Sequence, residues 1–326
     1  MKKSLSILLK GSVVVIGWAL TPVIGEYLID YNRQLSPYQL AFFRYFIAAI
    51  VLYFILIFQQ KVKNSEIIYS LKSKWPKYIL VSVMSAFMPV LLFLAVENTS
   101  ASSASFLLNS NIILIPIFAI IFLKEKMKKN YIIGIVVSTI GLFLVIFDNN
   151  LLALADLSLN TIIGNLLAFG SGFFWALYTV FLKKFFADEN PILVTFISLL
   201  IGSLYLVFFA FVIPPYVTMT LDILGVILVI VIAVLSTSLA YSYWLSLLKV
   251  LPTTKTGIIQ SFVPMTSVLL SFIFLNESIT YIFGIGGVLI ICGIIIVEWK
   301  VKEQFAEFNN KNQEEPSEKV DVIETK

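Results

Sequence analysis

Residues 121–125 read Ile-Phe-Leu-Lys-Glu, and residues 273–277 read Ile-Phe-Leu-Asn-Glu, 152 positions later. The same offset relates two pairs of glycines, Gly134 with Gly286 and Gly141 with Gly293. A short shared word occurs by chance in an apolar chain, but a glutamate followed by two glycines in register is a much rarer coincidence. The sequence therefore indicates an internal duplication. The orientation of the second copy relative to the first decides the architecture.

Apolar residues dominate the chain. Of its 326 residues, 59% are hydrophobic and 13% are charged, whereas soluble proteins carry about 25% charged residues. Apolar stretches of about 18 residues or more lie between short charged clusters, which is enough to cross a hydrocarbon core of ~30 Å as a helix. Continuous rather than alternating apolar runs favour helices over a barrel. The sequence therefore predicts an all-α integral membrane protein.

Ten spans are expected, at 5–29, 37–58, 78–97, 102–123, 130–147, 161–182, 192–213, 222–246, 257–276 and 281–299. With the N-terminus in the cytoplasm, all but two of the 23 lysines and arginines fall in inner segments. The exceptions are Arg33, in an outer loop, and Arg44, within a span. The positive-inside rule therefore places both termini in the cytoplasm of a multi-pass protein of the cell membrane.

Each copy contains five spans, an odd number, so the second copy must enter the membrane from the opposite side. We expect a first repeat at 1–148, a second repeat at 161–299 and a disordered cytoplasmic tail at 300–326, which is charged and poor in aromatic residues. Inverted repeats of this kind are the architecture of many secondary transporters, whose substrate site lies near the membrane midplane between the halves.

Several classes of function are disfavoured by what the sequence lacks. There is no histidine, which excludes a Ser-His-Asp triad and histidine metal sites, and no phosphate-binding G-x-x-x-x-G-K-[ST] loop. The single cysteine, Cys292, allows no internal disulfide, and a net charge of +4 is no nucleic-acid signature. We expect no catalytic residues, no metal and no cofactor, so the chain is not predicted to be an enzyme or to bind nucleic acid.

Further motifs recur in order in both copies. The first copy has Gly17-Trp18, Ser36-Pro37, Arg44 and Leu123-Lys124-Glu125, and the second has Trp175-Ala176, Asn190-Pro191, Pro264 and Leu275-Asn276-Glu277. Over residues 5–299 this order resembles the drug/metabolite transporter superfamily, and within it the EamA-type transporters with ten helices. The resemblance implies a secondary transporter that exports small metabolites such as amino acids. The copies differ, since Lys183 stands eight residues after Trp175 but Glu26 stands eight after Trp18.

Arg44 is the least expected residue of the spans. It lies seven residues past Pro37, about 10 Å below the outer surface, where a cation costs ~2.5–3.5 kcal/mol on insertion scales. It either belongs to an anion site or substrate pathway, or anchors helices through an ion pair or backbone carbonyls. Glu26 and Glu97 are its candidate partners. Both are also candidate coupling carboxylates, because burial raises a carboxyl pKa toward neutrality.

Aromatic and amide side chains are concentrated in five of the spans. They either tie helices together or line a cavity, because buried amides need partners in lipid. Their distribution favours a central cavity with aromatic walls and few charges, suited to neutral or zwitterionic amphipathic metabolites. The predicted pathway residues are Trp18, Thr21, Arg44, Asn109, Asn111, Trp175, Tyr178, Tyr241, Trp244 and Gln260.

Other recurrent residues are interpreted structurally. Glu125 and Glu277 are expected to make polar ties to short loops at the ends of helices, and the four repeated glycines are expected to allow close helix packing. The expected partners are membrane lipid and a small-molecule substrate of unknown identity, and the oligomeric state, a homodimer included, is left open. The alternative to a transporter is a non-transporting membrane protein, such as a sensor or an assembly subunit.

Overall fold

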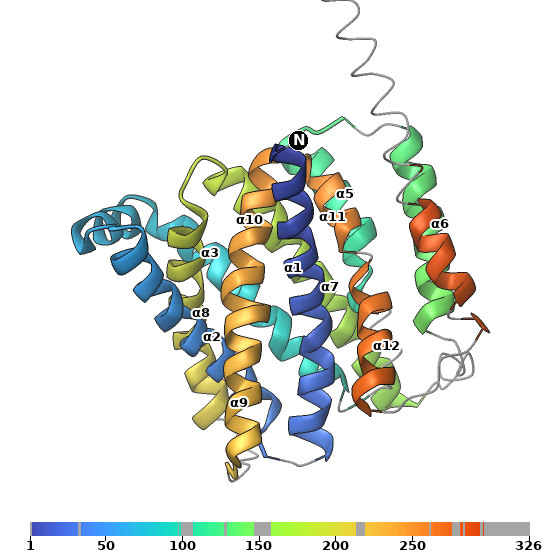
Figure 1. Ribbon diagram of the computed structural model, residues 1–326, viewed down its shortest axis with the longest axis horizontal. Helices are drawn as coiled ribbons and strands as arrows, with labels where there is room; N and C mark the ends of the chain where they lie inside the picture. Colours follow the sequence, from blue (N-terminus) through green and yellow to red (C-terminus); the bar gives the residue numbers. More distant parts are fainter. Residues whose placement is uncertain are drawn as a thin grey trace, which may run out of the picture.

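The computed structural model describes residues 2–31, 34–96, 98, 107–126, 129–146, 158–212, 219–260, 262–275, 281–282, 284–293 and 296. All regular secondary structure within these residues is helical, and the helices pack side by side in a bundle (Figure 1). Six helical segments are long and apolar enough to cross a membrane, and four shorter apolar helices complete the order of the ten expected spans. The predicted all-α membrane fold is confirmed.

The elements of the first half are α1 (Lys2–Glu26), continued by the π-helical turn η1 (Tyr27–Tyr31), α2 (Pro37–Phe54), continued by η2 (Ile55–Gln59), α3 (Asn64–Val96), α5 (Asn111–Leu123) and α6 (Lys129–Ile146). Those of the second half are α7 (Leu159–Phe186), α8 (Pro191–Phe211), α9 (Ile223–Val231), the π-helical η4 (Ile232–Leu239), α10 (Ala240–Val250), α11 (Thr253–Ile259) and α12 (Phe262–Leu275). A last apolar helix follows at Gly284–Gly293.

The Ser-Pro and Asn-Pro motifs begin α2 and α8. The Ser36 side chain accepts a hydrogen bond from the Gln39 backbone N–H, and the Gln39 side chain accepts one from the Ser36 N–H, which completes a capping box. The Asn190 side chain accepts from the Ile192 N–H in the same way. Proline in the first turn has no N–H to leave unpaired. These local signals explain why both helices begin where the sequence predicts.

The third helix is longer than expected. Instead of starting near residue 78, α3 starts at Asn64 and runs through a kink at Lys74, whose φ and ψ are −129° and 22°. Its first turns bury Ile67 and leave Ile68 exposed, so this lysine-rich stretch is a partly buried helix rather than a loop. A search for long apolar runs cannot detect such a segment.

Two predicted spans are broken rather than continuous. In the span expected at 102–123, α5 starts only at Asn111, after a turn at 109–110, and residues 99–106 lie outside the described residues. In the span expected at 257–276, a turn at Gln260 separates α11 from α12. Since α5 and α12 start 151 positions apart, the two breaks occupy corresponding places in the duplication to within one residue.

Helices of the two halves pack against each other throughout the bundle. α3 packs on α7 and α8, α2 packs on α8 and η4, and α1 packs on α10, η4 and α12. α6 stands beside the orange-red helix at 284–293 on one side of the bundle (Figure 1). The largest fully buried side chains include Trp244, Tyr45, Tyr178 and Tyr241, so the core lies where α1, α2, α7 and α10 meet.

The repeated glycines lie at one helix crossing. A methyl group on Gly141 would lie 2.6 Å from the carbonyl oxygen of Gly286, and one on Gly293 would lie 2.6 Å from that of Gly134. The later glycine of each helix meets the earlier glycine of the other, so the two helices run antiparallel. Small residues permit such close backbone approach in a membrane. This is the geometry expected of corresponding helices in oppositely oriented copies.

Candidate functional site

Five of the ten predicted pathway residues form one aromatic cluster, contributed by α1, α7 and α10. The rings of Trp18 and Trp175 meet edge to face with centroids 4.9 Å apart, and Trp244 lies 5.1 Å from Trp18. Tyr178 and Tyr241 lie 5.4 and 5.6 Å from Trp175. These spacings fall in the range of favourable aromatic pairs. The cluster joins matching tryptophans of the two halves at the centre of the bundle.

Two polar atoms of this cluster have hydrogen bonds to neighbouring side chains. The indole N–H of Trp244 donates to Thr179 Oγ1 at 3.3 Å, and the Tyr241 and Tyr45 hydroxyls lie 3.2 Å apart. Trp175, in contrast, is 3% exposed, and its Nε1 has no acceptor in the described part of the chain. A buried unpaired donor costs about 1–3 kcal/mol. Such a donor can be satisfied by an acceptor on a bound molecule.

Arg44 lies next to this cluster on α2 and is 3% exposed. Its Nε donates to Thr237 Oγ1 at 3.2 Å, and its guanidinium carbon lies 5.7 Å from the centroid of the Tyr45 ring. Among the described side chains, no carboxylate lies within 4.0 Å of it. The Glu26 side chain and Glu97 lie outside the described residues, so their pairing with Arg44 and their coupling role remain predictions.

The π-helical η4 connects Arg44 to the centre of the bundle. Ser236 Oγ donates to the Gly17 carbonyl, Thr237 Oγ1 donates to the Ile232 carbonyl, and Ser238 Oγ donates to the Ala48 carbonyl. A methyl group on Gly17 would lie 2.8 Å from the Leu235 carbonyl oxygen, so α1 and η4 are in backbone contact. π-Helical turns are frequent at functional sites.

These three hydroxyl residues were not among the predicted pathway residues. Their sequence signal is present, because Ser236-Thr237-Ser238 is a polar triplet inside an otherwise apolar span. They connect α1 and α2, which belong to the first half, to η4 of the second.

Each of the two helix breaks has a buried amide side chain beside it. Asn111 is 1% exposed, and its Nδ2 donates to the Leu108 carbonyl at 2.7 Å. Its Oδ1 has no donor within the residues that the structure describes, and neither has Oε1 of Gln260, which is 8% exposed. Unpaired amide oxygens at both breaks are acceptors for a cation, an ammonium group or water.

Each break lies against a helix that contributes to the aromatic cluster. Leu108 and Ser110 abut Gly172, one helical turn before Trp175. The residue before Gln260, Ile259, abuts Gly11, which lies seven residues or about 10 Å before Trp18 on α1. Of the helices that contribute to the cluster, α7 packs on α5 and α1 packs on α12, and the two interrupted helices also contact each other through α5 and α11.

The other two predicted pathway residues lie beside the cluster rather than in it. Thr21 Oγ1 is 3.5 Å from the Gly17 carbonyl oxygen within its own helix. Asn109 is buried in the turn that precedes α5.

One end of the bundle carries a polar network between the two halves. Glu125 Oε1 accepts from Lys183 Nζ at 3.1 Å and from the Thr253 N–H and Oγ1 at 3.1 and 2.7 Å. Lys183 also donates to the Leu251 carbonyl at 2.8 Å. Burial raises the pKa of Glu125, but the Thr253 hydrogen bonds and the Lys183 ammonium outweigh it and hold that pKa below its ordinary value.

Further ties join the same end. Lys74 pairs with Glu189, Lys249 donates to the Glu189 carbonyl at 2.7 Å, and Asn190 donates to Gln60 at 2.7 Å. Residues in or next to four interhelical loops that the sequence predicts to be cytoplasmic therefore meet at one end of the bundle. The expected polar tie at Glu125 is present, whereas Glu277 lies outside the described residues.

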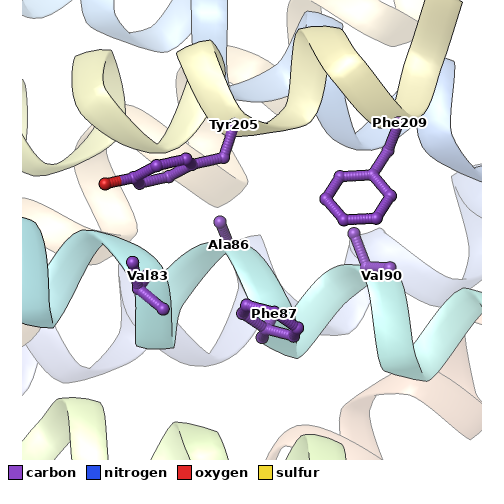
Figure 2. Close-up of a pocket in the computed structure, with 6 residues that line it drawn as sticks. All are labelled: Val83, Ala86, Phe87, Val90, Tyr205 and Phe209. Carbon is purple, nitrogen blue, oxygen red and sulfur yellow. The ribbon is translucent and has the colours of Figure 1, made fainter. Parts of the chain in front are cut away.

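A separate groove lies between α3 and α8 and has a volume of about 250 Å³. Its lining has no charged side chain, and no predicted pathway residue takes part in it (Figure 2). The residues that line it are Val83, Ala86, Phe87, Val90, Tyr205 and Phe209. It is suited to hydrocarbon, since the hydroxyl of Tyr205 is the one polar side-chain group of its lining.

Comparisons with known proteins agree with this architecture. A family model described as the EamA-like transporter family matches residues 5–147 and again 162–299. An uncharacterized transporter of Bacillus subtilis, YyaM, is 28% identical over 89% of this chain and 92% of its own length. An uncharacterized transporter of Archaeoglobus fulgidus is 25% identical over 82% of this chain and 90% of its own.

A crystal structure described only as that of a protein has the same fold. It superposes with a TM-score of 0.77 at 15% identity and covers 92% of this chain and 98% of the solved one.

Proposed function

Because this chain belongs to the EamA-like transporter family, we propose that it is a secondary transporter that exports a small metabolite, such as an amino acid, from the cell. Transport proceeds by alternating access, in which the two inverted halves rock against each other around a central site. The protein lies in the cytoplasmic membrane with both termini inside. It catalyses no chemical reaction, in keeping with a chain that has no histidine and no phosphate-binding loop.

The observation that carries this proposal is the contact of Trp18 with Trp175, on two helices that each pack on an interrupted helix. Matching helices of the two halves meet at these rings, so a molecule bound there touches both halves. Discontinuous helices in corresponding positions are the usual builders of substrate sites in inverted-repeat transporters, because a helix break presents unpaired backbone and side-chain groups to the ligand. The unpaired oxygens of Asn111 and Gln260 support this assignment.

The polar network at Glu125 supports the mechanism. It holds α5 of the first half to α7 and α11 of the second at the end that carries the predicted cytoplasmic loops. On this proposal, the network closes the inner end of the bundle. Opening toward the cytoplasm then requires that Lys183 and Thr253 separate from Glu125, and this ion-paired latch re-forms in each transport cycle.

The proposal is tested in proteoliposomes loaded with single unlabelled amino acids and presented with the same amino acid in radiolabelled form. Counterflow above empty liposomes is expected for at least one amino acid. It should be lost in Trp175→Ala and kept in Trp75→Ala, which removes a tryptophan that is 57% exposed on α3. The amino-acid assignment is wrong if folded protein gives no counterflow with any amino acid, and the central site is wrong if Trp175→Ala matches the wild type.

A further inference from the structure

We propose that the first turns of α3, together with the loop before them, bind anionic phospholipid headgroups of the membrane leaflet that this end of the bundle faces. We call this region the headgroup surface. Its members are Lys61, Lys63, Ile68, Tyr69 and Lys72. The inference goes beyond the proposed transport function and does not depend on it, because it requires only that the bundle spans a membrane.

The kink in α3 places this region at the edge of the membrane. Residues 75–95, after the kink at Lys74, form the apolar part of a membrane-spanning helix. Residues 61–77 instead carry five lysines and one acidic residue. Trp75, the first residue after the kink, is 57% exposed, and tryptophan prefers the membrane–water interface. The light-blue start of α3 projects from the side of the bundle (Figure 1), so its first turns lie at headgroup level.

The outer side of these turns combines apolar and cationic side chains. Ile67 and Ser70 are buried and face the bundle. Ile68 and Lys72, four residues apart, share another side of the helix, and both are exposed. Tyr69, beside Ile68, is 75% exposed. A lysine stem can pack along apolar groups while its ammonium reaches a headgroup, so this side can contact hydrocarbon and phosphate together.

The lysines of the headgroup surface carry charge that the described part of the chain does not neutralise. Lys61, Lys63 and Lys72 are exposed, and no described carboxylate lies within 4.0 Å of their ammonium groups. Lys74 differs, because it pairs with Glu189, and it is therefore not counted in the surface. Each lysine near an anionic membrane surface strengthens binding about fivefold. Charge complementarity thus selects an anionic lipid over a zwitterionic one.

Contacts on both sides of the helix hold this region in place. The Tyr53 hydroxyl of α2 donates to Asn64 Oδ1 at 3.2 Å where α3 begins. The hydroxyls of Ser70 and Tyr78 lie 2.9 Å apart across the kink. The outward side is therefore presented in a fixed position, and a preformed surface loses little conformational freedom when it binds.

A phospholipid fits these features better than a soluble anion does. The helix continues directly into a membrane span, and its lysines stand beside exposed apolar side chains. A phospholipid presents an anionic phosphate next to hydrocarbon, so one molecule satisfies both kinds of group. A soluble anion would leave Ile68 and Tyr69 uncovered.

The test uses a fluorescent reporter within the surface. Ser65 is exposed and lies four residues before Tyr69, so Ser65→Cys in a Cys292→Ser background carries a bimane label on the outward side. The full-length protein in neutral detergent is titrated with phosphatidylglycerol or phosphatidylcholine of the same acyl chains. We expect a half-maximal change in emission at an at least tenfold lower concentration of phosphatidylglycerol. This preference should shrink in 1 M salt, where charges are screened within about 3 Å.

Two triple variants remove the same charge from different places. Replacing Lys61, Lys63 and Lys72 with Gln should abolish most of the preference for phosphatidylglycerol. Replacing three exposed lysines between α5 and α6 with Gln should keep it; these are Lys124, Lys126 and Lys129. All six positions are exposed, so both variants should fold, and equal melting temperatures with the wild type verify this.

Several outcomes would overturn the headgroup surface. Equal half-maximal concentrations of the two lipids in the wild type would do so, and so would a preference that survives 1 M salt or the Lys61, Lys63 and Lys72 replacements. An equal loss in the control variant would show that the net charge of the whole bundle, rather than this surface, selects the lipid. Tighter binding of soluble polyglutamate than of phosphatidylglycerol would assign the surface to an acidic protein partner instead.

Discussion

The Ser138 hydroxyl of α6 donates to the carbonyl oxygen of Ile290 at 3.5 Å. Ile290 lies 152 positions after Ser138 and is therefore the residue that corresponds to Ser138 in the second copy. In two oppositely oriented copies, a residue meets its counterpart only where the pseudo-twofold axis passes. The flanking glycine contacts, Gly141 with Gly286 and Gly293 with Gly134, are arranged symmetrically around this pair. The sequence repeat and the helix crossing are therefore related by the same pseudo-twofold axis.

The glycine crossing should not tolerate even one added methyl group. Gly141→Ala would place a Cβ 2.6 Å from the Gly286 carbonyl oxygen, whereas the matched change at Gly284 meets nothing within 4 Å. We expect Gly141→Ala to destabilise the protein by about 1–3 kcal/mol through overpacking and Gly284→Ala to stay within about 0.5 kcal/mol. Thermal unfolding in detergent measures both. Equal melting temperatures for the two variants would contradict the crossing.

The topology makes a prediction about which loops face the cytoplasm. In a Cys292→Ser background, cysteines at Lys63 and Lys184 should be labelled by a membrane-impermeant maleimide only after the inner face is opened. Cysteines at Ser158 and Met219 should be labelled in intact cells. All four positions are exposed, so differences in labelling report sidedness. Labelling of Lys63 and Lys184 positions from opposite sides would refute the inverted arrangement.

The latch at Glu125 should depend on pH in a definite direction. The pKa of Glu125 lies below its ordinary value in the folded protein, so its stabilising contribution is fully present above the unfolded-state pKa of about 4.3. It is lost as the pH falls through the lower folded-state pKa. At pH 7 we expect Glu125→Gln to cost about 0.5–1 kcal/mol, since the group is partly exposed.

The measurement is thermal unfolding of wild type and Glu125→Gln as a function of pH. The two curves should converge below about pH 4, and Glu66→Gln, an exposed carboxylate on α3, should show a smaller difference at pH 7. A gap between wild type and Glu125→Gln that persists or widens in acid would show that ionised Glu125 does not hold the latch.

Local signals explain what the sequence could predict. The caps at Ser36 and Asn190 are set by neighbouring residues, and the order of apolar helices follows from the runs themselves. The duplication places Trp18 and Trp175 in matching helices, and the contact between their rings is a result of the tertiary packing.

What could not be predicted depends on tertiary packing. A break inside an apolar run leaves its mean hydropathy unchanged, so the turns at 109–110 and 260 are invisible to hydropathy. The hydroxyls of Ser236 and Thr237 acquire their roles only when η4 docks on α1 and α2. The start of α3 was missed for a different reason, since it is helical but its charged residues keep it out of any long apolar run.

Gln260 offers a test that separates function from stability. Its Oε1 is buried and has no donor among the described residues, so replacing it with leucine of similar size removes an unsatisfied polar atom. Such replacements are nearly neutral or stabilising, by up to about 1 kcal/mol. If the oxygen binds substrate, Gln260→Leu should therefore melt at or above the wild-type temperature and yet lose most counterflow activity. Gln59→Leu, at an exposed position at the end of η2, is the matched control and should keep both properties. A Gln260→Leu protein that is stable and fully active would show that the break in this helix serves packing, and that the substrate binds elsewhere.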